Sequence, residues 1–98
     1  MAPCHVTFRG WACRVERASY GGTDRIALPL YDVEDGEPVA VATVHMPELT
    51  LAADEVVIKD YSENEGMLTT LVAAGVVSPP LREVQGRYVT LYVCRCLI

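Results

Sequence analysis

The sequence predicts an α+β domain: an antiparallel sheet of five to seven short strands with one helix, at about residues 62–74, packed on one face. Three observations indicate this fold class. Short runs alternate apolar and polar side chains, Asp35-Gly36 separates two apolar runs as a hairpin turn would, and Ser62 to Glu65 has the pattern of a helix start. With 98 residues, the chain is expected to form a single domain, 1–98.

The N-terminal region is expected to be extended. Residues His5–Arg9 and Ala12–Arg17 mix apolar and basic side chains, and Gly10 between them suits a bulge or turn. They form either one bent strand or a tight pair of strands. Tyr20–Asp24 contains consecutive glycines, which predicts a loop.

Two further strands flank Asp35-Gly36. In the first, Ile26, Leu28 and Leu30 alternate with other residues, as in a half-buried strand. Because Pro29 lacks an N–H group, this strand is expected at a sheet edge or in an irregular pairing. The second run, Val39–Met46, is nearly apolar on both faces, which predicts a central strand.

The predicted helix begins with a capping box. In this motif the Ser62 hydroxyl would accept the N–H of Glu65, and the Glu65 carboxylate would accept the N–H of Ser62. Met67, Leu68, Leu71 and Val72 would then form one apolar stripe.

Gly75 is placed as the left-handed residue beyond the end of the helix, and Pro79-Pro80 forbids its continuation. The rest of the chain is expected to form a hairpin: Arg82–Val84, a turn at Gln85-Gly86, and a second strand within Arg87–Leu97.

Charge is distributed unevenly along the chain. Segment 26–81 carries ten acidic side chains and one base, Lys59, whereas the terminal segments carry the other seven bases, all arginine. Such segregation bears on partners and association rates. It favours a binding protein over an enzyme, and we expect a partner to be contacted by Asp32, Glu34, Asp35, Glu37, Asp54, Glu55, Asp60, Glu63 and Glu65.

The cysteines are candidates for metal binding or nucleophilic chemistry. A zinc site would need ligands that are distant along the chain, and no local pattern marks one thiol as activated. We interpret the cysteines as small buried residues and expect no metal, cofactor or catalytic residue. The residues weighed for these roles are Cys4, Cys13, Cys94, Cys96, His5 and His45.

The N-terminus has no apolar segment of the kind that directs export, which predicts a cytoplasmic protein with reduced thiols. No apolar stretch approaches the roughly 20 residues that span a membrane. Direct binding of nucleic acid through the terminal arginines and Trp11 is disfavoured, because the net charge of −5 opposes the approach of a polyanion.

The run Val57-Ile58-Lys59-Asp60-Tyr61-Ser62-Glu63-Asn64-Glu65-Gly66-Met67-Leu68, continued by residues 71–77, resembles a family of small uncharacterised proteins from bacteria and phages. Residues 35–44 and 93–95 are similar to the same family. The resemblance implies a compact protein carried by phages or mobile elements, among which acidic inhibitors of host defence such as anti-CRISPR proteins are frequent. It implies no catalytic residues.

These observations predict a non-enzymatic, acidic, protein-binding inhibitor. Its carboxylates would dock on the basic nucleic-acid-binding surface of a larger host protein or ribonucleoprotein and compete there with phosphate. The alternative is a small accessory domain that forms a homodimer through a sheet edge or a tyrosine-bearing face.

Overall fold

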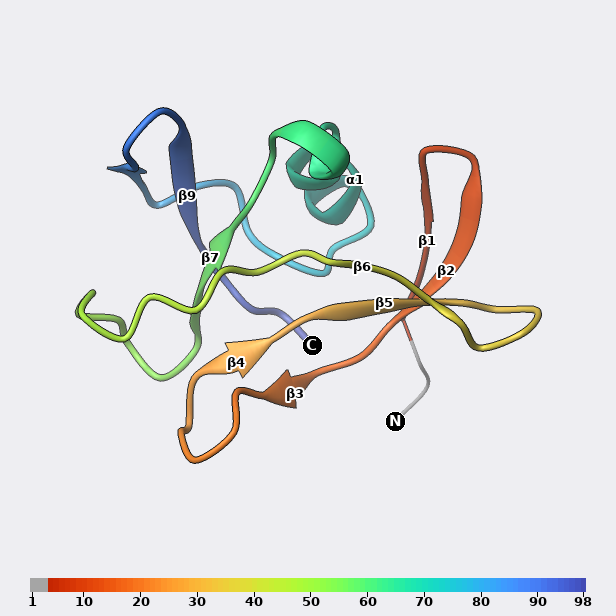
Figure 1. Cartoon of the computed structure of the whole chain (residues 1–98), viewed down its shortest axis with the longest axis horizontal. Coiled ribbons are helices and arrows are strands. Elements are labelled where there is room, and N and C mark those ends of the chain that lie inside the picture. Colours follow the sequence, from red (N-terminus) through yellow and green to blue (C-terminus); the bar gives the residue numbers. More distant parts are fainter. Residues whose placement is uncertain (1–3) are drawn as a thin grey trace.

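The computed structural model describes residues 4–98, and its elements confirm an α+β domain (Figure 1). Antiparallel strands make up most of the regular structure, and one α-helix packs against them. In chain order the elements are β1 (Cys4–Phe8), β2 (Trp11–Val15), β3 (Ala18–Ser19), β4 (Ile26–Ala27), β5 (Pro29–Asp32), β6 (Pro38–Val41), β7 (Glu55–Ile58), the 3-10 helix η1 (Ser62–Asn64), α1 (Met67–Ala73), β8 (Arg82–Gln85) and β9 (Thr90–Arg95).

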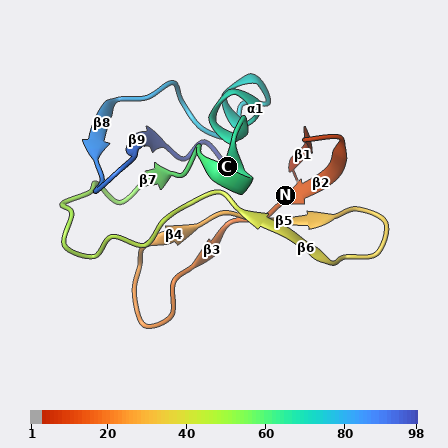
Figure 2. The same cartoon turned by 45° about the horizontal axis from the view of Figure 1, so that its top comes forward.

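The strands form three antiparallel groups. One sheet has the order β1-β2-β5-β6, another the order β7-β9-β8, and β3 pairs with β4. The β1–β2 and β5–β6 hairpins extend toward one side of the molecule, and the β8–β9 hairpin lies on the other side (Figure 2). The first two predicted runs therefore form a tight pair of strands, and the C-terminal hairpin is confirmed.

β3 and β4 prolong the pairing of β2 with β5. The Glu16 N–H donates to the carbonyl oxygen of Pro29 at 3.1 Å, and the Tyr20 N–H donates to that of Arg25 at 3.0 Å. The ladder is interrupted at Leu28, directly before Pro29, which confirms the irregular pairing predicted there. An edge position for this strand is wrong, because β5 lies between β2 and β6.

The turn at Asp35-Gly36 joins β5 to β6, as predicted. Pro38 pairs with Tyr31 and Ala40 with Leu30, so Val39 is the extra residue of a bulge. The prediction that residues 39–46 form a central strand is wrong, since β6 ends at Val41 and lies at the edge of its sheet.

Beyond β6 the chain crosses from the first sheet to the second. Thr43 forms an isolated antiparallel bridge with Ile58 of β7. The Val44 N–H donates to the Val57 carbonyl at 3.0 Å, and the Lys59 N–H donates to the Ala42 carbonyl at 2.9 Å. On the other side, the Ala42 N–H donates to the carbonyl of Leu28, between β4 and β5, at 2.9 Å. The crossing segment thus has main-chain bonds on both sides, which explains why apolar residues occupy both of its faces.

The helical region differs from the continuous helix predicted at 62–74. It consists of η1 and α1, separated by Glu65 and Gly66. The capping box is wrong: the Glu65 N–H donates to the Ser62 carbonyl at 3.1 Å, and neither side chain caps the helix. Gly66 precedes α1 with φ of 92°, a conformation that glycine adopts without strain. Asp60 supplies the cap instead, because its Oδ1 accepts the Leu68 N–H at 2.9 Å.

The end of α1 is as predicted. Gly75 has φ of 72°, its N–H donates to the Val72 carbonyl at 3.1 Å, and the Val76 N–H donates to the Leu71 carbonyl at 2.9 Å. These two bonds define a Schellman motif, which satisfies carbonyls that a helix end leaves unpaired.

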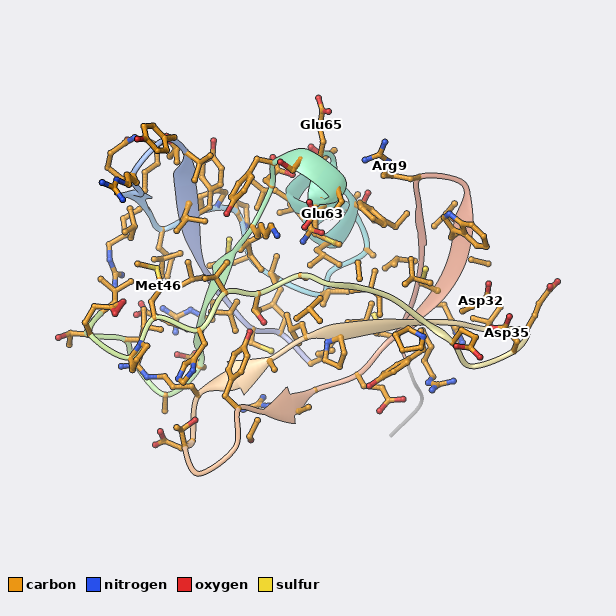
Figure 3. The ribbon with its side chains drawn as sticks, viewed as in Figure 1. Arg9, Asp32, Asp35, Met46, Glu63 and Glu65 are labelled. Carbon is orange, nitrogen blue, oxygen red and sulfur yellow. The ribbon has the colours of Figure 1, made fainter. Side chains whose placement is uncertain are left out.

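The core has two parts, one on each face of the β7-β9-β8 sheet. On the face toward α1, side chains such as Leu28, Leu30, Ile58, Met67 and Leu71 are fully buried. On the opposite face, Val57, Leu91 and Val93 are covered by the segment that contains Met46 and Leu49 (Figure 3). Cys13, Cys94 and Cys96 belong to the first part, so the interpretation of these three thiols as buried packing residues is confirmed.

The capping box and the Asp60 cap predict different effects of substitution on stability. We expect Asp60→Ala to lower the free energy of unfolding by about 1 kcal/mol, the usual effect of losing a cap, whereas Ser62→Ala and Glu65→Gln change it little. Urea unfolding followed by circular dichroism measures all three. A larger loss in Ser62→Ala or Glu65→Gln than in Asp60→Ala would contradict the assignment of the cap.

Candidate partner-binding surface

The turn between β5 and β6 carries four of the nine carboxylates predicted to bind a partner. We call Asp32, Glu34, Asp35 and Glu37 the acidic tip. Among residues 4–98 none of the four forms an ion pair, in contrast to several other acids of the chain. Figure 3 shows Asp32 and Asp35 where this hairpin extends away from the body of the molecule.

Hydrogen bonds from main-chain N–H groups, two of them to aspartate side chains, hold the acidic tip in shape. Asp32 Oδ1 accepts the Glu34 N–H at 2.8 Å, and Asp35 Oδ1 accepts the Glu37 N–H at 2.9 Å. The Asp32 N–H donates to the Glu37 carbonyl at 2.8 Å, which closes the turn. Each aspartate therefore has one oxygen engaged in the turn and a second oxygen available to a partner. A turn ordered in this way loses little conformational freedom on binding.

Trp11 lies on β2, the strand that pairs with β5, and the sequence suggested it only for nucleic-acid binding and not as a contact to a protein partner. It is the only tryptophan of the chain, and 55% of it is exposed. Trp11, Cys13 and Val15 alternate along β2, so they face the same way, as does Phe8, the partner of Trp11 across the hairpin; the other three side chains are buried and only the indole is exposed. Asp32 pairs directly with Cys13 and therefore shares this face. Alternation alone predicts a buried indole, so no signal in the sequence reveals its exposure.

A groove of about 530 Å³ extends from Trp11 to η1. Arg9, at the turn of the β1–β2 hairpin, spans it: its guanidinium donates to the carbonyls of Ser62 at 3.5 Å and Glu63 at 3.4 Å (Figure 3). We call this hollow the tip groove. Its lining residues are Phe8, Arg9, Trp11, Val39, Ser62 and Glu63.

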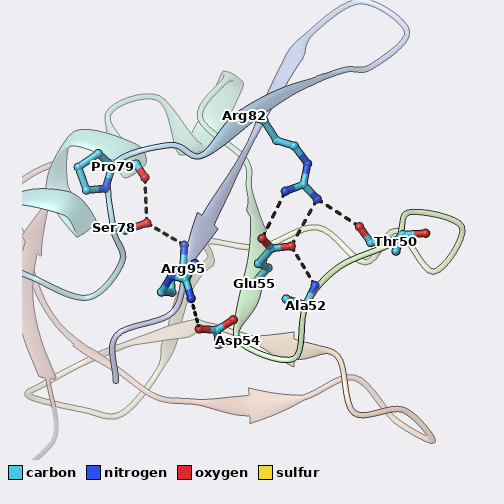
Figure 4. A network of polar contacts seen from close by, with 8 residues as sticks. All are labelled: Thr50, Ala52, Asp54, Glu55, Ser78, Pro79, Arg82 and Arg95. Atoms are coloured by element: carbon cyan, nitrogen blue, oxygen red, sulfur yellow. Dashed lines mark hydrogen bonds and ion pairs between the residues drawn. The ribbon is translucent and has the colours of Figure 1, made fainter.

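Asp54 and Glu55 do not join the acidic tip. They lie at the start of β7, where Asp54 pairs with Arg95 at 2.9 Å and Glu55 pairs with Arg82 at 3.3 Å (Figure 4). The Ala52 N–H and the Arg82 guanidinium lower the pKa of Glu55. These two carboxylates are neutralised by arginines of β8 and β9, so their ion pairs link β7 to these strands.

The remaining three predicted residues have separate positions. Asp60 caps α1, and Glu63 forms an ion pair with Lys59 that lowers the pKa of the Glu63 carboxyl. Glu65 is exposed, and its side chain points outward from the loop before α1 (Figure 3). The structure therefore brings together four of the nine residues, with Glu63 on the opposite side of the tip groove.

The thiols of Cys13 and Cys94 lack the environment of a reactive cysteine. Burial raises the pKa of Cys94 to about 11, and burial together with the nearby charge of Asp32 raises the pKa of Cys13. Nucleophilic cysteines have lowered pKa values. Within residues 4–98 no three His, Cys, Asp or Glu side chains are placed to hold a metal ion. His45, weighed as a ligand, is exposed and stacks on Tyr20 at 4.5 Å between ring centroids.

Because the thiol of Cys94 is buried, the free energy of unfolding is expected to depend on pH in the alkaline range. Its pKa is raised from the ordinary value of 9.0 to about 11, so an unfolded chain ionises first. The free energy of unfolding is expected to fall as pH rises from about 9 to about 11. Cys94→Ala should have a shallower fall than the wild-type protein. The free energy of unfolding is measured with urea at each pH, and an equal fall with pH in wild type and Cys94→Ala would contradict this.

Comparison of the chain with protein-family models, with curated proteins and with solved structures found no match to any of them. Within the part of the chain that the structure describes, no helix has the length and apolar character needed to cross a lipid bilayer. The case for function therefore depends on the geometry of the acidic tip and Trp11.

Proposed function

We propose that this protein is a non-enzymatic binding domain that docks through its acidic tip and Trp11 on a basic surface of a larger protein or ribonucleoprotein. The observation that carries the proposal is the contrast among the acids. Of the five other predicted residues, Asp54, Glu55 and Glu63 are matched with bases, Asp60 caps a helix and Glu65 is exposed, whereas all four carboxylates of the acidic tip lie on one turn without a cationic partner among the described residues.

The two components of the surface contribute differently to binding. An exposed ion pair contributes about 0.2–1 kcal/mol, so the acidic tip mainly raises the association rate and selects a cationic partner. An indole buried in an interface contributes about 2 kcal/mol or more. Trp11 would therefore supply much of the affinity, either by packing on apolar atoms or by stacking on a guanidinium.

A basic surface that accepts this tip is one that also attracts phosphate. Occupation by the acidic tip would therefore compete with nucleic acid and inhibit a host machine that binds it, as the sequence analysis predicts. Such competition weakens as salt screens the charges, since the Debye length falls from about 10 Å at 0.1 M to about 3 Å at 1 M ionic strength.

Charge reversal at the tip tests the proposal. Because Trp11 is the only tryptophan, its fluorescence reports directly on this surface during titration with a nona-arginine peptide. We expect the triple variant Glu34→Lys, Asp35→Lys, Glu37→Lys to bind the peptide at least about tenfold more weakly at low salt. The wild-type affinity should fall steeply as salt rises.

A matched control separates local from overall charge. The triple variant Asp24→Lys, Glu48→Lys, Glu83→Lys changes the net charge equally at three exposed positions elsewhere. It should keep most of the affinity, because long-range charge is screened more than close contacts. Equal losses in the two triple variants, or no binding by wild type, would overturn the proposal.

A further inference from the structure

The outer edge of β1 carries main-chain groups that point away from the sheet. Among residues 4–98, β1 pairs only with β2, in a register that places Thr7 opposite Ala12 and His5 opposite Arg14. The Ala12 carbonyl accepts the Val33 N–H at 3.1 Å, so the main-chain groups of Ala12 point away from β1. In an antiparallel pair, the main-chain groups of Thr7, opposite Ala12, then point away from β2, and those of His5, two positions along β1, do the same. The N–H and C=O groups of His5 and Thr7 therefore face the free edge.

A groove runs along this edge. One wall consists of β1 residues 5–7, and the other is the face of α1 that carries Thr69, Thr70, Ala73 and Ala74. Its volume is about 470 Å³, and no Asp, Glu, Lys or Arg lines it. Figures 1 and 2 both show α1 beside β1 with no other strand on that side. We call this the edge groove.

We propose that the edge groove binds an extended peptide segment of a partner polypeptide, which adds to the sheet as a strand antiparallel to β1. Two residues of the segment would pair with β1, one with His5 and the other with Thr7, and each of these pairs would exchange two main-chain hydrogen bonds. The residue between them would lie opposite Val6, and its side chain would point inward, toward α1. Because short, uncharged side chains line that space, the inward residue is apolar and of moderate size.

A second copy of this chain fits the groove less well than a free segment. In the symmetric pairing that joins His5 of each copy to Thr7 of the other, the residue opposite Val6 would be Val6 of the other copy. That side chain is already packed in its own core, where only 7% of it is exposed. It could not fill the space beside Ala73 and Ala74, whereas a free segment has an unengaged side chain at this position.

The site is separate from the acidic tip, and its test does not depend on that surface. The probe is a displayed library of random nonapeptides selected on the full-length protein, followed by synthesis of an enriched sequence. Thr7→Pro removes an outward N–H that β2 does not use, a change that edge strands tolerate. Ala73→Trp fills the groove from α1, and Ala53→Trp is the matched control at an exposed position in a loop.

We expect the synthetic peptide to bind wild type and Ala53→Trp equally, and to bind Thr7→Pro and Ala73→Trp at least about tenfold more weakly. N-methylation of the two peptide residues that pair with His5 and Thr7 should abolish binding. N-methylation of the residue between them should have little effect, because its N–H points away from β1. Hydrogen exchange at the His5 and Thr7 amides should slow when the peptide binds.

Three results would each overturn the proposal. One is the enrichment of no sequence, and another is equal binding of enriched peptides to wild type, Thr7→Pro and Ala73→Trp. The third is a wild-type dimer in analytical ultracentrifugation that Thr7→Pro converts to a monomer, since a second copy would then occupy the edge.

Discussion

The fold depends on the hydrogen bonds around Thr43, a polar residue in the core where the chain crosses between sheets. Its side chain is 5% exposed, and its Oγ1 lies 2.8 Å from the Tyr20 hydroxyl and accepts the Leu28 N–H at 3.3 Å. Its main chain bridges to Ile58 of β7. Leu28 lies where the ladder between β2 and β5 is interrupted, so Thr43 supplies the acceptor that the interrupted ladder lacks. A buried N–H left without an acceptor would cost about 1–3 kcal/mol.

Both proposed surfaces are positioned through this crossing. The Val41 carbonyl accepts an N–H of Asn64, which is 2% exposed, at 2.8 Å, and this bond fixes η1 against β6. From η1, the carbonyls of Ser62 and Glu63 meet Arg9 and close the tip groove. After η1, α1 packs on the core and forms one wall of the edge groove. The contacts that join the sheets therefore also position elements that line the two grooves.

Local sequence signals predicted local structure well where one conformation was favoured. Asp35-Gly36 forms the hairpin turn, and Gly75 ends α1, because these residues adopt conformations that others rarely do. The signals failed where a distant contact decided the outcome. Ser62 and Glu65 fit a capping box, yet Asp60 caps the helix because Gly66 permits the chain to turn before α1. The apolar run after Pro38 suggested a central strand, although its two apolar faces result from crossing between sheets.

The same limit applies to the acids, because sequence shows how many charges a segment carries but not which ones find partners. Asp54 meets Arg95 across 41 positions of sequence, a pairing that follows from the register of β7 with β9. The acidic tip escapes such pairing for a geometric reason: the β5–β6 hairpin extends beyond the sheet that would supply a neighbour. Trp11 is exposed although Phe8, its partner across the β1–β2 hairpin, is buried in the core. The fold, and not the local pattern of residues, thus leaves the carboxylates of the acidic tip without cationic partners among residues 4–98 and leaves the indole exposed.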